Sequence, residues 1–261
     1  MVKTRAGGQC VGVGDLSIAY NHPHDLLGIL EVFVLDVYSC TSLREDDIVL
    51  DIGTGVGDFA LAASRRIGKS GLVIALEPSP EDFRALTKNL QSNSVKNVVP
   101  FRCAIGPDGG QVTIEFKGNR FTAPTRTFDG IMAEAFVKTS APARGLTFVK
   151  MDVEGAEATV LRDLAAFLTG VRAIAIELHG TAEEVDAFLK PRGFAFARLG
   201  RADYLLSSAR FTLRHPTQAV TFWRKLGESG YRPGLSKILR GIDISRGDEL
   251  LVGRYVRKAA D

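Results

Sequence analysis

The stretch "DIVLDIGTGVGDFALAASRRIG" (47–68) decides the fold. It begins as a short β-rich run and then passes through three closely spaced glycines, at 53, 55 and 57, into a segment with helical spacing that stops at Gly68. Glycine permits positive φ and lets a ligand approach bare backbone, and the N-terminus of the following helix presents free N–H groups. The stretch therefore predicts a strand, a ligand-binding turn and a helix in succession.

The same alternation of strand and helix continues from about residue 24 to residue 209. Helical spacing recurs at 24–39, 58–68, 80–90, 156–168 and 182–189, and strand-length apolar runs occur at 47–53, 71–79, 97–106, 145–155, 171–180, 193–200 and 202–208. Such interleaving predicts an α/β, Rossmann-like, doubly wound sheet that is mostly parallel and carries helices on both faces. The runs 193–200 and 202–208 are too close for a crossover helix, so we expect them to pair antiparallel.

The regular alternation of strands and helices sets the expected domain organisation. It breaks at "GGQVTIEFKG" (109–118), which alternates like a hairpin strand, and 119–145 is expected to be loop-rich. We predict an N-terminal segment (1–23), one α/β domain (24–209) with an insertion (107–145), and a C-terminal extension (210–261). At 261 residues the chain is long enough to bury a substantial core in one large domain.

Composition restricts the classes of protein and partner. No apolar run has the length of a membrane span, and the N-terminus lacks the apolar stretch of a signal peptide, so the expectation is a cytoplasmic protein with no membrane partner. The three cysteines are widely spaced and indicate neither a disulfide framework nor a zinc site. Residues 210–261 hold 11 of the 33 Lys and Arg but 5 of the 30 Asp and Glu. A basic segment of this kind fits an RNA partner, or an extension that packs on a more acidic body.

Acidic side chains at the strand ends indicate which ligand binds. Ligands of such sheets lie beyond the carboxyl ends of the strands. Asp51 lies two residues before the first glycine. Glu77, followed by Pro78, ends the next strand, at the sequence separation from the glycine turn where a carboxylate can accept ribose hydroxyls. The glycines read G-x-G-x-G and not the dinucleotide-binding G-x-G-x-x-G. Asp51 would repel a pyrophosphate but suits ammonium and sulfonium charges, so the predicted ligand is S-adenosyl-L-methionine (SAM).

With these landmarks the sequence resembles the class I SAM-dependent methyltransferases, and more narrowly the FkbM-like family. The matching motifs are "VLDIGTGVG", "ALEPSP", "TRTFDGI" (125–131), "VKMDVEGAEATVL" and "IAIELHG", and they span roughly residues 25–200. Many family members read G-A-N-x-G where this chain has Gly53–Thr54–Gly55. The resemblance implies a seven-stranded sheet whose last strand is antiparallel, SAM across the ends of the first four strands, and O-methylation as the commonest activity. The cofactor-binding residues it implies are Asp51, Gly53, Thr54, Gly55, Gly57, Glu77, Pro78 and, near the adenine, Ala104.

The carboxylates of "FVKMDVEGAEATVL" (148–161) are the candidates for catalysis. Asp152 ends a strand beside the glycine turn, where it could orient or deprotonate an acceptor. His179, at the end of the next strand, is the second candidate, because an unperturbed imidazole suits a base near neutrality. Glu154 is the third, although acids in a first helical turn, Glu157 among them, are also stabilised by the helix dipole. Asp152, Glu154 and Glu177 have the chemistry of a divalent-metal site, but we predict none.

Three hypotheses about function follow. The first is O-methylation of a hydroxyl on a small molecule or glycan. The second is an RNA methyltransferase that uses the basic extension, in which Phe222, Trp223 and Tyr231 are interleaved with basic residues. Against it, the strand ends in "MDVEG" and not in the N-P-P-Y type of sequence that resembles enzymes methylating exocyclic amines. The third is a SAM-binding scaffold without catalysis.

Overall fold

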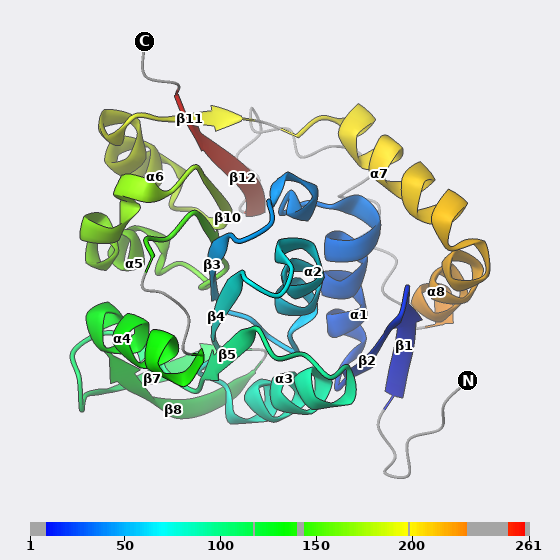
Figure 1. The fold of residues 1–261 in the computed structure, drawn as a ribbon, viewed down its shortest axis with the longest axis horizontal. Helices are drawn as coiled ribbons and strands as arrows, with labels where there is room; N and C mark the ends of the chain where they lie inside the picture. The colour runs from blue at the N-terminus through cyan, green and yellow to red at the C-terminus, as the bar shows by residue number, and fades with distance from the viewer. Residues whose placement is uncertain (1–8, 117, 140–143, 198, 229–249, 259–261) are drawn as a thin grey trace.

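The protein is built on one twisted seven-stranded sheet with the strand order β11-β12-β10-β9-β3-β4-β5 (Figure 1). The computed structural model describes residues 9–116, 118–139, 144–197, 199–228 and 250–258. The strands are β3 (Ile48–Ile52), β4 (Leu72–Leu76), β5 (Val98–Phe101), β9 (Phe148–Met151), β10 (Ala173–His179), β11 (Phe194–Ala197) and β12 (Leu250–Arg257). Strands β5, β4, β3, β9 and β10 pair in parallel, and β12 is antiparallel to both β10 and β11. The predicted Rossmann-like, mostly parallel sheet is confirmed.

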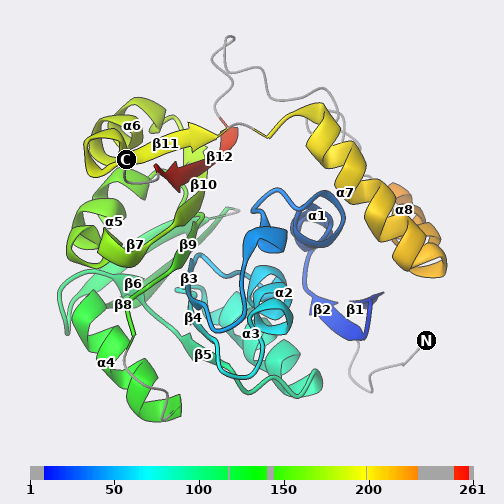
Figure 2. The same ribbon diagram turned by 45° about the horizontal axis from the view of Figure 1, so that its top comes forward.

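Two hydrophobic cores lie on opposite faces of this sheet. Helices lie on both of these faces (Figure 2). Successive side chains of a strand point to opposite faces, so in β3 Val49 packs in one core and Ile48, Leu50 and Ile52 in the other. The first face is covered by α1 (Pro23–Leu30), α2 (Asp58–Ile67), α3 (Pro80–Ser92), α7 (Arg201–Arg214) and α8 (Pro216–Glu228). The second is covered by α4 (Phe128–Thr139), α5 (Glu157–Asp163) and α6 (Ala182–Leu189).

The predicted strand at 202–208 is wrong, because these residues begin helix α7. The Asp203 carboxylate accepts a hydrogen bond from the Gly200 backbone N–H and caps the helix. Tyr204 and Phe211 then fall on one helical face and enter the core. The antiparallel strand that the 202–208 run was expected to supply is β12, which comes from the segment 210–261 and lies between β10 and β11.

The predicted hairpin strand at 109–118 is confirmed, and the expectation of a loop-rich segment at 119–145 is wrong. Strand β7 (Gln111–Phe116) forms the predicted hairpin, pairing antiparallel with β8 (Asn119–Arg126), and β8 also pairs with the short β6 (Ala104–Ile105). The region 119–145, expected to be loop-rich, contains β8 and helix α4. Four apolar side chains of α4 recur at helical spacing and are buried: Phe128, Ile131, Met132 and Ala135.

The N-terminal part of the chain packs in the first core. A hairpin of β1 (Gln9–Val13) and β2 (Leu16–Tyr20) leads into α1, and the helix continues as a π-helical turn (Glu31–Leu35). The predicted helix at 24–39 is therefore present but ends at Asp36, whose φ of 54° is left-handed. None of the helices in the described part of the chain combines the length and apolar character that crossing a bilayer requires.

Candidate active site

The glycine turn after β3 is fixed by close contacts on two sides. Gly53 has a φ of 74°, and a Cβ placed on it would lie 1.8 Å from the backbone oxygen of Asp152. Gly57, with a φ of 93°, is the N-cap of α2, and a Cβ there would lie 2.6 Å from Leu86. Gly55 differs, because no heavy atom of the described residues lies within 4 Å of its Cβ position. The turn thus touches the end of β9 and leaves open space at Gly55.

Glu77 is held at the end of β4 by two backbone N–H groups. Gly55 donates to its Oε2 and Ser79 to its Oε1, each over 2.7 Å. The side chain is buried, and burial raises the pKa of its carboxyl to about 8. Thr54 has a different environment: it is buried, and its hydroxyl donates to the backbone oxygens of Asp51 and Leu76. Thr54 therefore ties β3 to β4, and any cofactor contact it makes stays a prediction.

A buried ion pair underlies the turn. The register of β3 and β9 places Asp51 opposite Lys150, so both side chains lie on the same face of the sheet. The Lys150 Nζ is 3.5 Å from Asp51 Oδ1, 4.0 Å from Asp152 Oδ2, and donates to the backbone oxygen of Gly53 over 2.6 Å. Asp51 is fully buried, and neither of its carboxylate oxygens has a hydrogen-bond partner within the described residues. Burial raises the pKa of Asp51, and Lys150 opposes that rise.

Further carboxyl groups surround Lys150, and their raised pKa values mean that they hold part of their protons at neutral pH in the ligand-free protein. Burial raises the pKa of Glu177 and of Asp58, each to about 7, and raises that of Glu31 well above its ordinary value. The neighbouring charge of Asp152 adds to the rise for Glu177 and Glu31. Glu177 Oε2 accepts a hydrogen bond of 2.9 Å from the Tyr38 hydroxyl. Five carboxylates thus surround one buried lysine, an arrangement that favours a cationic ligand.

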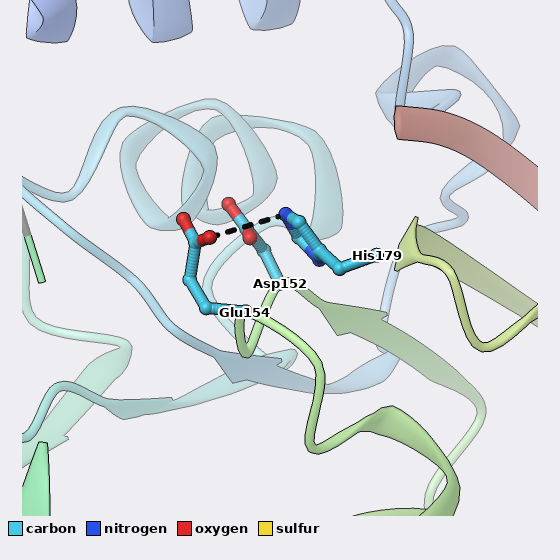
Figure 3. A group of neighbouring side chains, drawn as sticks. All are labelled: Asp152, Glu154 and His179. Carbon is cyan, nitrogen blue, oxygen red and sulfur yellow. Dashed lines mark ion pairs between the residues drawn. The ribbon is translucent and has the colours of Figure 1, made fainter. Parts of the chain in front are cut away.

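Asp152, Glu154 and His179 converge at the carboxyl ends of β9 and β10 (Figure 3). One potential ligand atom from each lies within 4.8 Å of the others, a spacing that could hold a metal ion. His179 Nε2 is 3.3 Å from Glu154 Oε2, so the imidazole already has an acidic partner there. Glu177, which the sequence grouped with the two acids, is not in this cluster. The absence of a metal stays a prediction.

His179 is anchored from behind by Glu157. Its Nδ1 lies 2.8 Å from Glu157 Oε1, and the same buried carboxylate accepts from the Gly155 backbone N–H and the Thr181 hydroxyl. Burial alone would lower the pKa of His179, but the bond to Glu157 and the charge of Glu154 raise it to about 9. The pKa of His179 therefore lies above the ordinary value of an imidazole, so the protonated ring predominates at neutral pH.

Comparison with known proteins decides the family. Residues 51–196, more than half of the chain, match the model of the methyltransferase FkbM domain. The chain belongs to this family. It is a SAM-dependent methyltransferase, as the glycine turn, Glu77 and the acidic strand ends predict.

Individual relatives are more distant. The chain is 28% identical over 150 residues to hexuronic acid methyltransferase AglP of Haloferax volcanii. The matched region covers 55% of this chain and 60% of AglP. The chain is 24% identical over 199 residues to methyltransferase 1 of Beauveria bassiana, covering 64% and 80%. It is also similar to the structure of Aeropyrum pernix fibrillarin in complex with natively bound SAM, with 15% identity, a TM-score of 0.41, and coverage of 75% and 77%.

Several residues of this FkbM-family site were not predicted from the sequence. Lys150 lies inside the recognised motif, but only the strand register shows that it meets Asp51. Glu31 and Tyr38 come from a segment outside the family match, and no spacing rule links them to the strand ends. Asp58 follows Gly57 directly and could have been found as an acid in the first turn of α2. Ala104 lies in β6, directly after β5, and its place beside the adenine stays a prediction.

Proposed function

We propose that this methyltransferase transfers the methyl group of SAM to a hydroxyl of a small molecule or glycan. The observation that carries the proposal is the position of Asp152, whose backbone abuts the glycine turn and whose carboxylate lies beside Lys150, Glu154 and His179. A carboxylate adjoining the donor-binding turn suits an acceptor that loses a proton as it is methylated.

The residues present fit SAM as the donor. Asp51 is a fully buried carboxylate whose oxygens lack hydrogen-bond partners in the described residues, and the backbone at Gly55 borders open space. Glu77 would accept the ribose hydroxyls, and the carboxyl groups around Lys150, which a cationic ligand would help to ionise, would hold the methionine end. When bound, SAM supplies an electrophilic methyl group. Pro78 and Gly57 belong to the same proposed cofactor site, next to Glu77 and at the N-cap of α2 respectively.

The chain's own groups then handle the acceptor and its proton. The acceptor hydroxyl would lie beside the Asp152 carboxylate, next to the glycine turn that would hold the donor. The hydroxyl proton passes to Asp152, which releases it to solvent. His179, protonated at neutral pH, donates from Nε2 and orients Glu154 or an acceptor oxygen, so it acts as a positioning residue and not as the base.

The acceptor class is proposed from one relative. AglP is by its name a hexuronic acid methyltransferase, and its similarity to this chain supports a sugar acceptor. The alternative of RNA loses one of its supports, because Phe222 is buried in the core and Trp223 packs against it, so neither is a free stacking platform. Tyr231 lies outside the described residues.

The test is transfer of a radiolabelled methyl group from SAM to a panel of acceptors: uronic acids, neutral sugars and tRNA. We expect label on a sugar acceptor, formation of S-adenosylhomocysteine (SAH) in equal amount, and resistance of the label to mild alkali, as for a methyl ether. An alkali-labile label would instead indicate a carboxyl ester, and label on RNA would overturn the proposal. Asp152→Asn should lower the turnover rate by about 10²–10⁴-fold while leaving the Kd for SAH nearly unchanged.

A further inference from the structure

The outer surface of α7 and α8 exposes an unusual share of the protein's large apolar side chains. Among the described residues five such side chains are exposed, and four of them belong to these two helices: Leu205 (64%), Leu206 (55%), Leu213 (83%) and Val220 (71%). The two helices lie at the outer edge of the molecule in both views (Figures 1 and 2). Concentrated exposure of this kind marks an interaction surface, whereas isolated exposed apolar residues do not.

The exposed residues of α7 form one continuous stripe. Ala202, Leu205, Leu206, Ala209 and Leu213 follow the spacing of a single helical face, and all five are exposed. The opposite face of α7 already packs in the core through Tyr204 and Phe211. The helix thus has two apolar faces, of which one, here called the outer stripe (Ala202, Leu205, Leu206, Ala209, Leu213), has no partner among the described residues.

Positive charge accompanies the outer stripe. Residues 201–228 contain five Lys and Arg but two Asp and Glu. Arg210 and Arg214 lie one turn apart at the flank of the stripe, are exposed, and have no ion-pair partner among the described residues. They also line a cavity of about 440 Å³ beneath α7. Asp203, the one acid of α7, is occupied by the Gly200 N–H.

We propose that the outer stripe docks on an anionic lipid bilayer. The leucines enter the boundary between headgroups and acyl chains with α7 parallel to the membrane plane, and Arg210 and Arg214 contact lipid phosphates, as in interfacial amphipathic helices. A second copy of this chain fits less well, because a two-fold contact would bring the arginines of both copies together without acids to pair them. The proposal is independent of the methyl acceptor and departs from the expectation of no membrane partner, which was argued from spanning segments and a signal peptide alone.

Co-sedimentation of the full chain with lipid vesicles tests the proposal. We expect binding to phosphatidylcholine vesicles that contain phosphatidylglycerol, little binding to phosphatidylcholine alone, and weaker binding at high salt. The triple variant Leu205→Ser, Leu206→Ser, Leu213→Ser should lose binding. Each of Arg210→Gln and Arg214→Gln should weaken it about fivefold, the effect of about 1 kcal/mol per basic residue.

The matched control is Val137→Ser. Val137 is the fifth exposed apolar side chain, at 80%, but it lies on α4 over the other face of the sheet, so its replacement should leave vesicle binding unchanged. Stabilisation by SAH in a thermal-shift assay shows that each variant is folded. Three results would overturn the proposal: no sedimentation with anionic vesicles, equal sedimentation of the triple variant, or a dimer in light scattering that the triple variant dissociates.

Discussion

At the scale of single residues, Lys150 organises the candidate site because it is the buried cation shared by Asp51, Asp152 and the Gly53 carbonyl. Lys150→Met would leave Asp51 without its buried cation, so folding must either bury an unpaired charge or bind a proton at Asp51. We expect a loss of about 3–5 kcal/mol in the free energy of unfolding, measured by urea denaturation. Adding Asp51→Asn should recover most of it, because the stranded charge is then removed.

A surface ion pair provides the comparison for Lys150. Arg162 and Glu184 are 3.3 Å apart, but their side chains are 59% and 64% exposed. Arg162→Met should therefore cost less than about 1 kcal/mol. If Lys150→Met alone and its double variant with Asp51→Asn were equally unstable, the buried pair would not be the source of the loss.

The carboxyl of Glu77 should make cofactor binding depend on pH. Its pKa is raised to about 8, so most of it is protonated at pH 7 in the free protein. Ribose hydroxyls donate to the ionised form, so binding favours ionisation, and affinity should rise with pH up to about 8 and then level off. Calorimetric titration of SAH between pH 6 and 9 should show this rise with release of a proton, and Glu77→Gln should bind weakly with a flat profile. Tightest binding at pH 6 would contradict this role for Glu77.

The charge of His179 bears on metal dependence. At neutral pH the protonated imidazole already places a positive charge between Glu154 and Glu157, and a divalent ion would have to displace that proton. We therefore expect equal methyl-transfer rates in EDTA and in added Mg²⁺. Loss of activity in EDTA that Mg²⁺ restores would instead place an ion on Asp152, Glu154 and His179.

At the scale of elements, the glycine turn joins β3 to the end of β9. A Cβ at Gly53 would overlap the Asp152 backbone oxygen, so Gly53→Ala must separate the turn from β9. We expect it to cost several times as much unfolding free energy as Gly55→Ala, which has a positive φ but open space and should cost about 1 kcal/mol. Urea denaturation of the two ligand-free variants measures the difference. Equal losses would mean that backbone conformation, and not contact with Asp152, determines the need for glycine at 53.

The elements that the sequence predicted well are those whose pattern is complete within one window. Strands β3, β4 and β10 are continuous apolar runs, and Ser79 caps α3 ahead of Pro80 as its residue type indicates. The run 202–208 was wrongly predicted as a strand, because a short run with a few apolar residues fits a strand and a buried helix equally well. Only when the window extends to Phe211 does the helical repeat of α7 become visible.

At the scale of the whole molecule, the site depends on contacts that no local pattern contains. The motif residues Asp51, Glu77 and Asp152 could be placed at one edge of the sheet from the sequence because strand ends are readable in sequence. Tyr38 reaches Glu177 across 139 positions, and β12 inserts beside β10 from the far end of the chain. Pairing over such separations follows from the register of the assembled sheet, which sequence spacing does not encode.

The assembled site should also set the pH dependence of the whole protein's stability. The pKa values of Asp58 and Glu177 are raised to about 7, that of Glu77 to about 8, and that of His179 to about 9. Each group is therefore protonated in the folded state at pH values where the unfolded chain, with ordinary values of about 3.9, 4.3 and 6.5 for Asp, Glu and His, has released its proton. Folding then binds protons, so the free energy of unfolding must fall as pH rises.

We accordingly expect the ligand-free protein to be most stable near pH 5 and to lose stability steadily toward pH 9, in thermal or urea unfolding at constant ionic strength. Glu77→Gln should flatten the part of the slope below about pH 8, because a neutral amide has no proton to lose. SAH should stabilise the protein more at pH 8 than at pH 6, since it binds the ionised form of Glu77. Stability that rises from pH 5 to pH 9 would contradict this prediction. It would show that the pKa values of these buried groups are not raised in the folded, ligand-free protein.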